Sequence, residues 1–114
     1  MTDKFFEELY LGTYRSRLAI IADILQAVSQ TAKKTHILFR TNLSYKVLQK
    51  YLVEVIRASL IHFENKKKCY TLTDKGNRFL DIYQEYLRNN KRVKAKLSEA
   101  LTKKKYLEEL CSGI

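Results

Sequence analysis

The chain of 114 residues contains no proline, three glycines and two cysteines. Cys69 and Cys111 are too few and too far apart in the sequence to frame a disulfide scaffold or a zinc site, so we predict two free thiols. Three glycines leave no glycine-rich loop that would hold the phosphates of a nucleotide. No apolar run approaches the roughly 20 residues of a membrane-spanning helix, so we predict no insertion into a membrane.

Catalytic patterns are also missing. The sequence shows no Ser/His/Asp or Cys/His set and no pair of carboxylates in an apolar setting. His36 has no Cys or acidic residue at the spacing of metal ligands, and for His62, on the predicted hairpin, we also expect a local hydrogen bond or a phosphate contact and not a metal. We therefore expect a protein that is not an enzyme and that has no metal, cofactor or small-molecule ligand. Residues 1–10 lack the charged and then apolar layout of a signal peptide, which favours a cytoplasmic location.

Positive charge dominates the composition. The 22 Lys and Arg residues against 12 Asp and Glu residues leave a net charge of +10 and a pI near 9.7. Such an excess favours a polyanionic partner, nucleic acid first and an anionic membrane surface second. The charge is unevenly placed, because residues 24–53 contain no acidic residue and residues 86–98 form a second acid-free run.

The spacing of apolar residues predicts three helices, at about residues 13–30, 35–40 and 45–58. The polar segment 29–34 allows a loop or one short strand. Ser44 is predicted to cap the third helix, because its hydroxyl can accept a hydrogen bond from a free backbone N–H. The residues predicted to face the core are Leu18, Ile21, Ile24, Leu25 and Val28 in the first helix, Ile37 and Leu38 in the second, and Leu48, Leu52, Val55 and Ile56 in the third.

Residues 61–64 and 69–72 alternate around a polar tip and predict a β-hairpin. Thr73 is predicted to cap a long helix after it. Gly76 in the first turn of that helix indicates close packing, since glycine costs a helix about 1 kcal/mol relative to alanine. The order predicts a mainly α (α+β) fold: an N-terminal extension at 1–14, a winged helix-turn-helix domain at 15–73 and a long C-terminal helix at 74–111. A short helix at 4–10 would cover the core, add to a dimer or recruit a partner.

A mostly apolar stripe runs along the long helix, at positions alternately four and three residues apart. A repeat of period 3.5 indicates a coiled coil, and one helix of this length cannot bury the stripe alone. The predicted partner is a second copy of the chain. The predicted dimer interface consists of Phe79, Tyr83, Tyr86, Asn90, Val93, Leu97, Ala100, Lys104, Leu107 and Cys111.

Lys104 favours an antiparallel pair of helices. A parallel, in-register pair would set the two Lys104 side chains against each other in one seam. In an antiparallel pair, stripe positions whose numbers sum to 190 face each other. That register places Lys104 over the ring of Tyr86 as a cation–π contact, with the two-fold axis near Ala95.

Residues 33–45 read KKTHILFRTNLSY, and residues 70–76 read YTLTDKG. In these two stretches the chain resembles the archaeal winged-helix DNA-binding proteins of the 10a type, the first stretch being the more specific. The resemblance covers roughly residues 15–110. It implies a homodimer joined by an antiparallel coiled coil, with one winged-helix head at each end, that binds duplex DNA in the nucleoid. The N-terminal extension is longer than is usual for that family.

The third helix of a winged helix enters the major groove, the second crosses the phosphate backbone, and the wing reaches the adjacent backbone or minor groove. On the third helix, Gln49 can bond an adenine edge in bidentate fashion, and a lysine can meet guanine. The predicted DNA-binding residues are Lys33, Lys34, His36, Arg40, Ser44, Tyr45, Lys46, Gln49, Lys50, Lys66, Lys67 and Lys68.

Several functions stay open at this point. A homodimeric transcriptional regulator that binds double-stranded DNA leads, and a chromosome-architectural protein of low sequence specificity is the nearest alternative. A winged helix that contacts protein is disfavoured by the basic third helix and wing. RNA binding is disfavoured because no exposed pair of aromatic residues for base stacking accompanies the basic residues.

Overall fold

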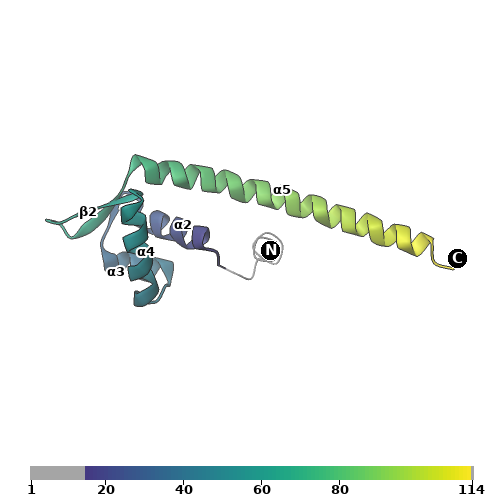
Figure 1. Cartoon of the computed structure of the whole chain (residues 1–114), viewed down its shortest axis with the longest axis horizontal. Helices are drawn as coiled ribbons and strands as arrows, with labels where there is room; N and C mark the ends of the chain where they lie inside the picture. Colours follow the sequence, from purple (N-terminus) through teal and green to yellow (C-terminus); the bar gives the residue numbers. More distant parts are fainter. Residues whose placement is uncertain (1–14, 114) are drawn as a thin grey trace. The chain divides into compact units, whose positions relative to one another are not determined.

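The computed structural model describes residues 15–113, and the predicted helix at 4–10 lies outside the described residues. In chain order the elements are α2 (Arg17–Val28), β1 (Thr31–Ala32), α3 (Lys34–Thr41), α4 (Tyr45–Arg57), β2 (Ile61–Glu64), β3 (Cys69–Leu72) and α5 (Asp74–Leu110) (Figure 1). Residues 15–84 form one compact unit, which we call the head. The later part of α5, from Glu85, belongs to a second unit. The predicted order of elements is confirmed.

Local signals in the sequence set the ends of α2. Ser16 precedes the helix, and its hydroxyl oxygen accepts a hydrogen bond from the backbone N–H of Ala19 at 3.0 Å. This bond satisfies one of the free N–H groups at a helix start. The helix ends at Val28 because Ser29 has a φ of +52°, outside the helical region. The helix is therefore shorter at its carboxyl end than the predicted end near Gln30.

The core of the head lies between the three helices and the sheet. Its fully buried side chains are Ile24, Leu25, Val28, Ile37, Leu48, Leu52 and Val55, all predicted to face inward. The prediction for Ile56 was wrong, because this side chain is 38% exposed. The buried positions of α4 are 48, 52 and 55, and at 100° per residue residue 56 lies about 40° beyond Leu52, outside the edge of that stripe. Leu18, at the start of the predicted stripe of α2, is also exposed.

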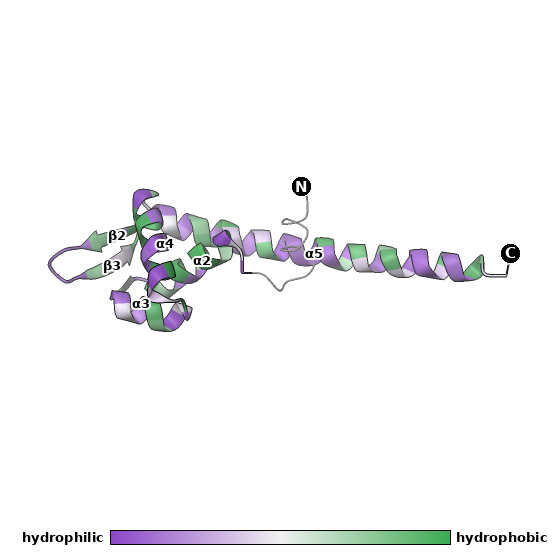
Figure 2. Cartoon of the chain, turned by 60° about the horizontal axis from the view of Figure 1, so that its bottom comes forward, coloured by the Kyte–Doolittle hydropathy of each residue, from purple (hydrophilic) through white to green (hydrophobic). Residues whose placement is uncertain are grey.

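A three-stranded antiparallel sheet closes one side of the core, in the order β1-β3-β2. The polar segment before α3 therefore contains a strand, in which Ala32 pairs with Tyr70. On the other side of β3, Phe63 pairs with Tyr70, and their ring centroids lie 4.9 Å apart. Figure 2 shows β2 and β3 side by side, joined by a hydrophilic tip that we call the wing tip, residues 65–68.

The turn between α4 and β2 is bound tightly to the start of α5. The hydroxyl of Thr73 accepts a hydrogen bond from the N–H of Gly76 at 3.0 Å, which confirms the predicted cap. The same hydroxyl lies 2.7 Å from the carbonyl oxygen of Ser59 and donates to it. Lys75 donates to the carbonyl oxygen of Ala58 at 2.7 Å. The long helix therefore begins at a defined place on the head.

Gly76 is buried at this junction. A Cβ atom there would overlap the carbonyl oxygen of Leu60 and would lie 2.6 Å from Cδ1 of Leu72. One turn further along α5, Phe79 and Leu80 pack against the core of the head. The close packing predicted from a glycine inside a helix is confirmed.

The part of α5 in the second unit continues without a break to Leu110. Its apolar residues include Val93 and Leu107 of the predicted stripe, and both are exposed in the single chain. Cys111 after the helix is exposed, Cys69 in β3 is buried, and neither forms a disulfide. None of the helices that the structure describes is long and apolar enough to cross a membrane.

We expect Gly76→Ala to destabilise the head by about 2 kcal/mol, because the added methyl group must push apart the carbonyl of Leu60 and the side chain of Leu72. Urea unfolding followed by circular dichroism measures the change. The matched control is Arg78→Ala, at an exposed position two residues further along the same helix, which should change the free energy of unfolding by less than about 0.5 kcal/mol. Equal stability of the two variants would contradict the packing at the junction.

Candidate nucleic-acid interface

The exposed face of α4 is oriented by its buried face. Leu48, Leu52 and Val55 are buried in the core, and this fixes the rotation of the helix about its axis. The opposite side carries Tyr45, Lys46, Gln49 and Lys50, all of which are exposed, as predicted. The start of α4 is held by Ser44, whose hydroxyl oxygen accepts a hydrogen bond from the N–H of Val47 at 3.2 Å. The predicted cap is confirmed. It uses the Ser44 hydroxyl only as an acceptor, so the O–H can still donate a hydrogen bond.

Lys34, in the first turn of α3, reaches across to the start of α4. Its ammonium group donates to the hydroxyl oxygen of Tyr45 at 3.0 Å and to the amide oxygen of Gln49. It also lies 4.5 Å from the centroid of the Tyr45 ring, in the position of a cation–π contact. We call Lys34, Tyr45 and Gln49 the α3–α4 cluster. It joins two predicted interface residues on α4 to one on α3.

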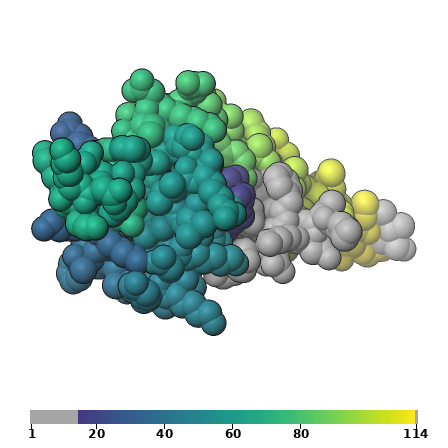
Figure 3. All heavy atoms as spheres, turned by 60° about the vertical axis from the view of Figure 1, so that its left-hand side comes forward, coloured from purple at the N-terminus to yellow at the C-terminus, as the bar shows by residue number. Residues whose placement is uncertain are grey.

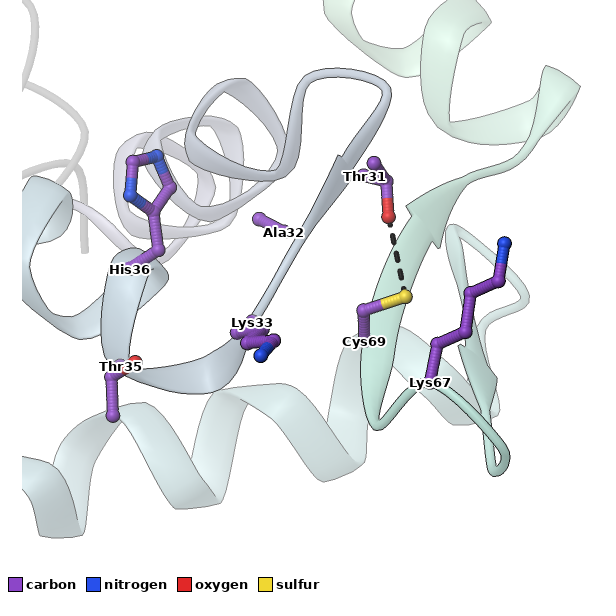
Figure 4. Close-up of a pocket in the computed structure, with 7 residues that line it drawn as sticks. All are labelled: Thr31, Ala32, Lys33, Thr35, His36, Lys67 and Cys69. Atoms are coloured by element: carbon purple, nitrogen blue, oxygen red, sulfur yellow. Dashed lines mark hydrogen bonds between the residues drawn. The ribbon is translucent and has the colours of Figure 1, made fainter.

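A cleft of about 550 Å³ lies between α3 and the wing. Lys33 and His36 line it on the α3 side and Lys67 on the wing side (Figure 4). Its floor includes Ala32 and Cys69, both largely buried. The hydroxyl of Thr31 donates to the sulfur of Cys69 at 3.3 Å, which ties β1 to β3 below the cleft. Predicted interface residues far apart in the sequence thus meet at one cleft.

Figure 3 shows α3 in blue, α4 in teal and the green-teal wing on the same face of the head. The cations on this face have few acidic neighbours. Asp23 and Glu54, which border the acid-free run 24–53, are each bound by an arginine of the α2 segment, Asp23 by Arg15 at 2.5 Å and Glu54 by Arg17. The negative charges nearest in sequence are therefore offset by other arginines.

Arg40 lies apart from the α3–α4 cluster. With Asp23, Gln26 and Ala27 it lines a separate pocket beside α2. Lys66 and Lys68, at the wing tip, are exposed as predicted, and the backbone N–H of Lys66 donates to the carboxylate of Glu64 at 3.2 Å. The predicted residues therefore form three groups: the face of α4 with Lys34, the cleft with the wing, and Arg40 on the α2 side.

Two features of this surface were missed from the sequence. Thr35 lines the cleft, and Phe39 on α3 is 86% exposed although it is aromatic. The helical repeat of α3 carried a signal for Phe39, because it lies two positions from the buried Ile37 and therefore on the opposite side of the helix. No local pattern in the sequence indicated that Thr35 lines the cleft, because the cleft forms only where the wing lies close to α3.

The sequence model of the winged helix-turn-helix family matches residues 14–91. The chain belongs to this family. Among solved structures, it is similar to the crystal structure of Sso10a-2, a DNA-binding protein from Sulfolobus solfataricus, with 28% sequence identity and a TM-score of 0.63. The match covers 76% of this chain and 97% of Sso10a-2. No curated protein matches the sequence.

These matches confirm the winged helix and the resemblance to 10a-type proteins that residues 33–45 and 70–76 indicated. The family match includes the head and the first part of α5. In a winged helix-turn-helix protein, α3 and α4 are the two helices of the motif and residues 61–72 are the wing. The face that carries the predicted cations is therefore the one formed by the motif and the wing together.

We expect Ser44→Ala to lower the free energy of unfolding by about 1 kcal/mol, because the N–H of Val47 loses its acceptor at the start of α4. Ser44→Asp is the control: its carboxylate also accepts this bond and should keep the stability near that of the wild type. Urea unfolding distinguishes the two. A wild-type stability for Ser44→Ala would mean that the cap contributes nothing to the position of α4.

Proposed function

We propose that the chain is a homodimer that binds double-stranded DNA and regulates transcription. The main support for this proposal is the exposed face of α4, which presents Tyr45, Lys46, Gln49 and Lys50. In winged-helix proteins this helix of the motif enters the major groove. The similar protein Sso10a-2 is described as DNA-binding, which supports the same partner here.

The charges around α4 suit a duplex. An α-helix fits the major groove, which is about 12 Å wide, and the side chains on its outer face reach base edges. In Figure 3, α3 and the wing lie on the same face of the head as α4, and Lys34 of α3 is bonded to Gln49 of α4. Such cations beside the groove would contact phosphates and set the position of α4 without reading sequence. The amide of Gln49 is the side chain best suited to reading a base, which favours a sequence-selective regulator.

The dimer is supported by apolar residues of α5 that lie outside the predicted stripe. Ile82, Leu87, Leu101 and Leu110 are 58%, 37%, 56% and 63% exposed in the single chain. In a heptad repeat they occupy the positions that flank the seam, Leu87 and Leu101 on one side and Ile82 and Leu110 on the other. Exposed apolar residues at flanking positions indicate an interface wider than the stripe alone.

These flanking residues match in the antiparallel register derived from the stripe. When stripe positions sum to 190, the flanking positions nearest in level sum to 188 on one side and to 192 on the other, an offset of two residues from the same level. Leu87 then meets Leu101 of the second copy, and Ile82 meets Leu110. The register was derived without these four residues, so their apolar pairing is independent support for it. Only Lys94 and Lys96, near the centre, meet the same residue of the second copy. The repulsion between these like charges opposes association, and the apolar pairs must contribute more free energy than it costs.

The register also determines how far apart the two heads begin. In this register, residue 76 of one copy lies level with position 114 of the second copy. That position is 38 residues along the helix from residue 76 of the second copy. At 1.5 Å per residue the two Gly76 residues would lie about 57 Å apart along the axis. This distance is nearer to two turns of DNA than to one, since one turn is about 34 Å.

Footprinting distinguishes a transcriptional regulator from a chromosome-architectural protein, because one protected operator indicates a regulator and uniform coverage indicates an architectural protein.

We expect the triple variant Lys46→Ala/Gln49→Ala/Lys50→Ala to bind a duplex at least about tenfold more weakly than the wild type, since it loses the side chains that reach base edges. Fluorescence anisotropy over a range of salt concentrations measures both affinity and salt dependence. If roughly six cations of each head meet phosphates, the wild-type slope of log K against log salt is about −5 per head.

The matched control for this titration is Lys103→Ala/Lys105→Ala, which removes the same number of charges from exposed positions of α5. It should weaken binding much less than the triple variant. Equal losses in the two variants would mean that affinity follows net charge alone and that α4 is not the reading surface. Failure of the wild type to bind duplexes at low salt would refute the proposed function.

For the dimer, we expect the variant Lys96→Cys/Cys111→Ser to crosslink to itself with a short bismaleimide, because residue 96 meets residue 96 of the second copy beside the antiparallel seam. Gel electrophoresis under denaturing conditions measures the yield. The wild type supplies the control through Cys111, which is exposed and would face its own copy only in a parallel pair. Efficient disulfide formation at Cys111, with no crosslink at 96, would establish parallel helices instead.

A further inference from the structure

The α3–α4 cluster has an arrangement that the sequence did not suggest. Lys34 comes from the first turn of α3 and is partly buried, whereas Tyr45 and Gln49 are exposed on α4. Tyr45 and Gln49 lie one turn apart on the same side of α4, and both polar groups are bonded to the ammonium group of Lys34. One cation thus holds two side chains of the proposed reading surface before any DNA is present.

The chemistry of the ammonium group determines how Gln49 is held. An ammonium group has three donors and no acceptor, so its partner in the amide of Gln49 must be the oxygen Oε1 and not the nitrogen Nε2. This bond leaves the two N–H donors of Nε2 unused. The same reasoning applies to Tyr45, whose oxygen accepts from Lys34 and whose O–H is left to donate. The cluster therefore presents donors.

A surface of donors distinguishes between the purines. In the major groove guanine presents two acceptors, N7 and O6, whereas adenine presents the acceptor N7 and the donor N6–H₂. The bidentate pairing of glutamine with adenine needs Oε1 as an acceptor for N6–H₂. Here that oxygen is already bonded to a cation, whose positive charge repels a further N–H donor. The adenine pairing expected from the residue type alone is therefore disfavoured.

We infer that Lys34 determines base specificity by holding the amide oxygen of Gln49, so that this part of the reading surface prefers guanine to adenine. The inference rests on the proposed function, because it assumes that α4 lies in the major groove. Lys34 acts here through Gln49 as a positioning residue. If Lys34 were only a phosphate contact, its removal would weaken binding to all sequences alike and leave the base preference unchanged.

The test is selection of binding sites from a pool of random duplexes, followed by sequencing, for the wild type, Lys34→Met and Lys34→Arg. We expect the wild type to prefer guanine over adenine about tenfold at one position of each half-site. Lys34→Met keeps the length of the side chain but frees Oε1 of Gln49, so the frequency of adenine at that position of the selected sites should rise. Lys34→Arg also donates without accepting and should keep the preference for guanine.

Lys33→Met is the matched control, because it removes the same charge one residue away on the side of the cleft. It should lower affinity without changing the base preference. In a Gln49→Ala background, Lys34→Met should no longer shift the preference, which shows that Lys34 acts through Gln49. Circular dichroism of each variant confirms that it is folded.

Two outcomes overturn the inference while the proposed function stands: Lys34→Met binds with an unshifted base preference, or the wild type already prefers adenine at the position that Gln49→Ala affects. A wild type that binds DNA with no preference at any position also overturns the inference, and supports the architectural role. Absence of any duplex binding by the folded wild type refutes the proposed function itself.

Discussion

At Gly76 the first turn of α5 lies against the carbonyl oxygen of Leu60, and no side chain fits between them. Thr73 and Lys75 reinforce this contact with hydrogen bonds to the turn between α4 and β2. The end of the proposed reading helix, the start of the wing and the start of the long helix therefore meet at one place. Because Phe79 and Leu80 also pack on the core, the first part of α5 belongs to the head.

The head separates its charges by element. The arginines of the α2 segment bind Asp23 and Glu54, whereas α3, the exposed face of α4 and the wing tip carry cations with few acidic neighbours. An ordinary solvated surface mixes charges of both signs. A face with an excess of positive charge raises the local concentration of a polyanion and speeds its association, and this effect falls as salt is added.

The long helix must satisfy two opposed requirements. Its exposed apolar residues, among them Ile82, Leu87, Leu101 and Leu110, need to be covered, and the proposed antiparallel dimer would cover these four in one register. The acid-free run 86–98 would fall at the centre of that proposed dimer and would bring like charges together.

The sequence by itself determined the secondary structure, most of the core and the caps. Periodicity and hydrogen-bonding capacity are local properties, so Leu48, Leu52 and Ser44 could be assigned from their neighbours in the chain. Only the tertiary structure decided that Ile56 is exposed, that Arg40 lies beside α2, and that Lys34 holds Gln49. These features depend on the rotation and crossing of helices, which are set by packing between residues distant in the sequence. A residue type indicates which hydrogen bonds are available, and the fold decides which of them are already used.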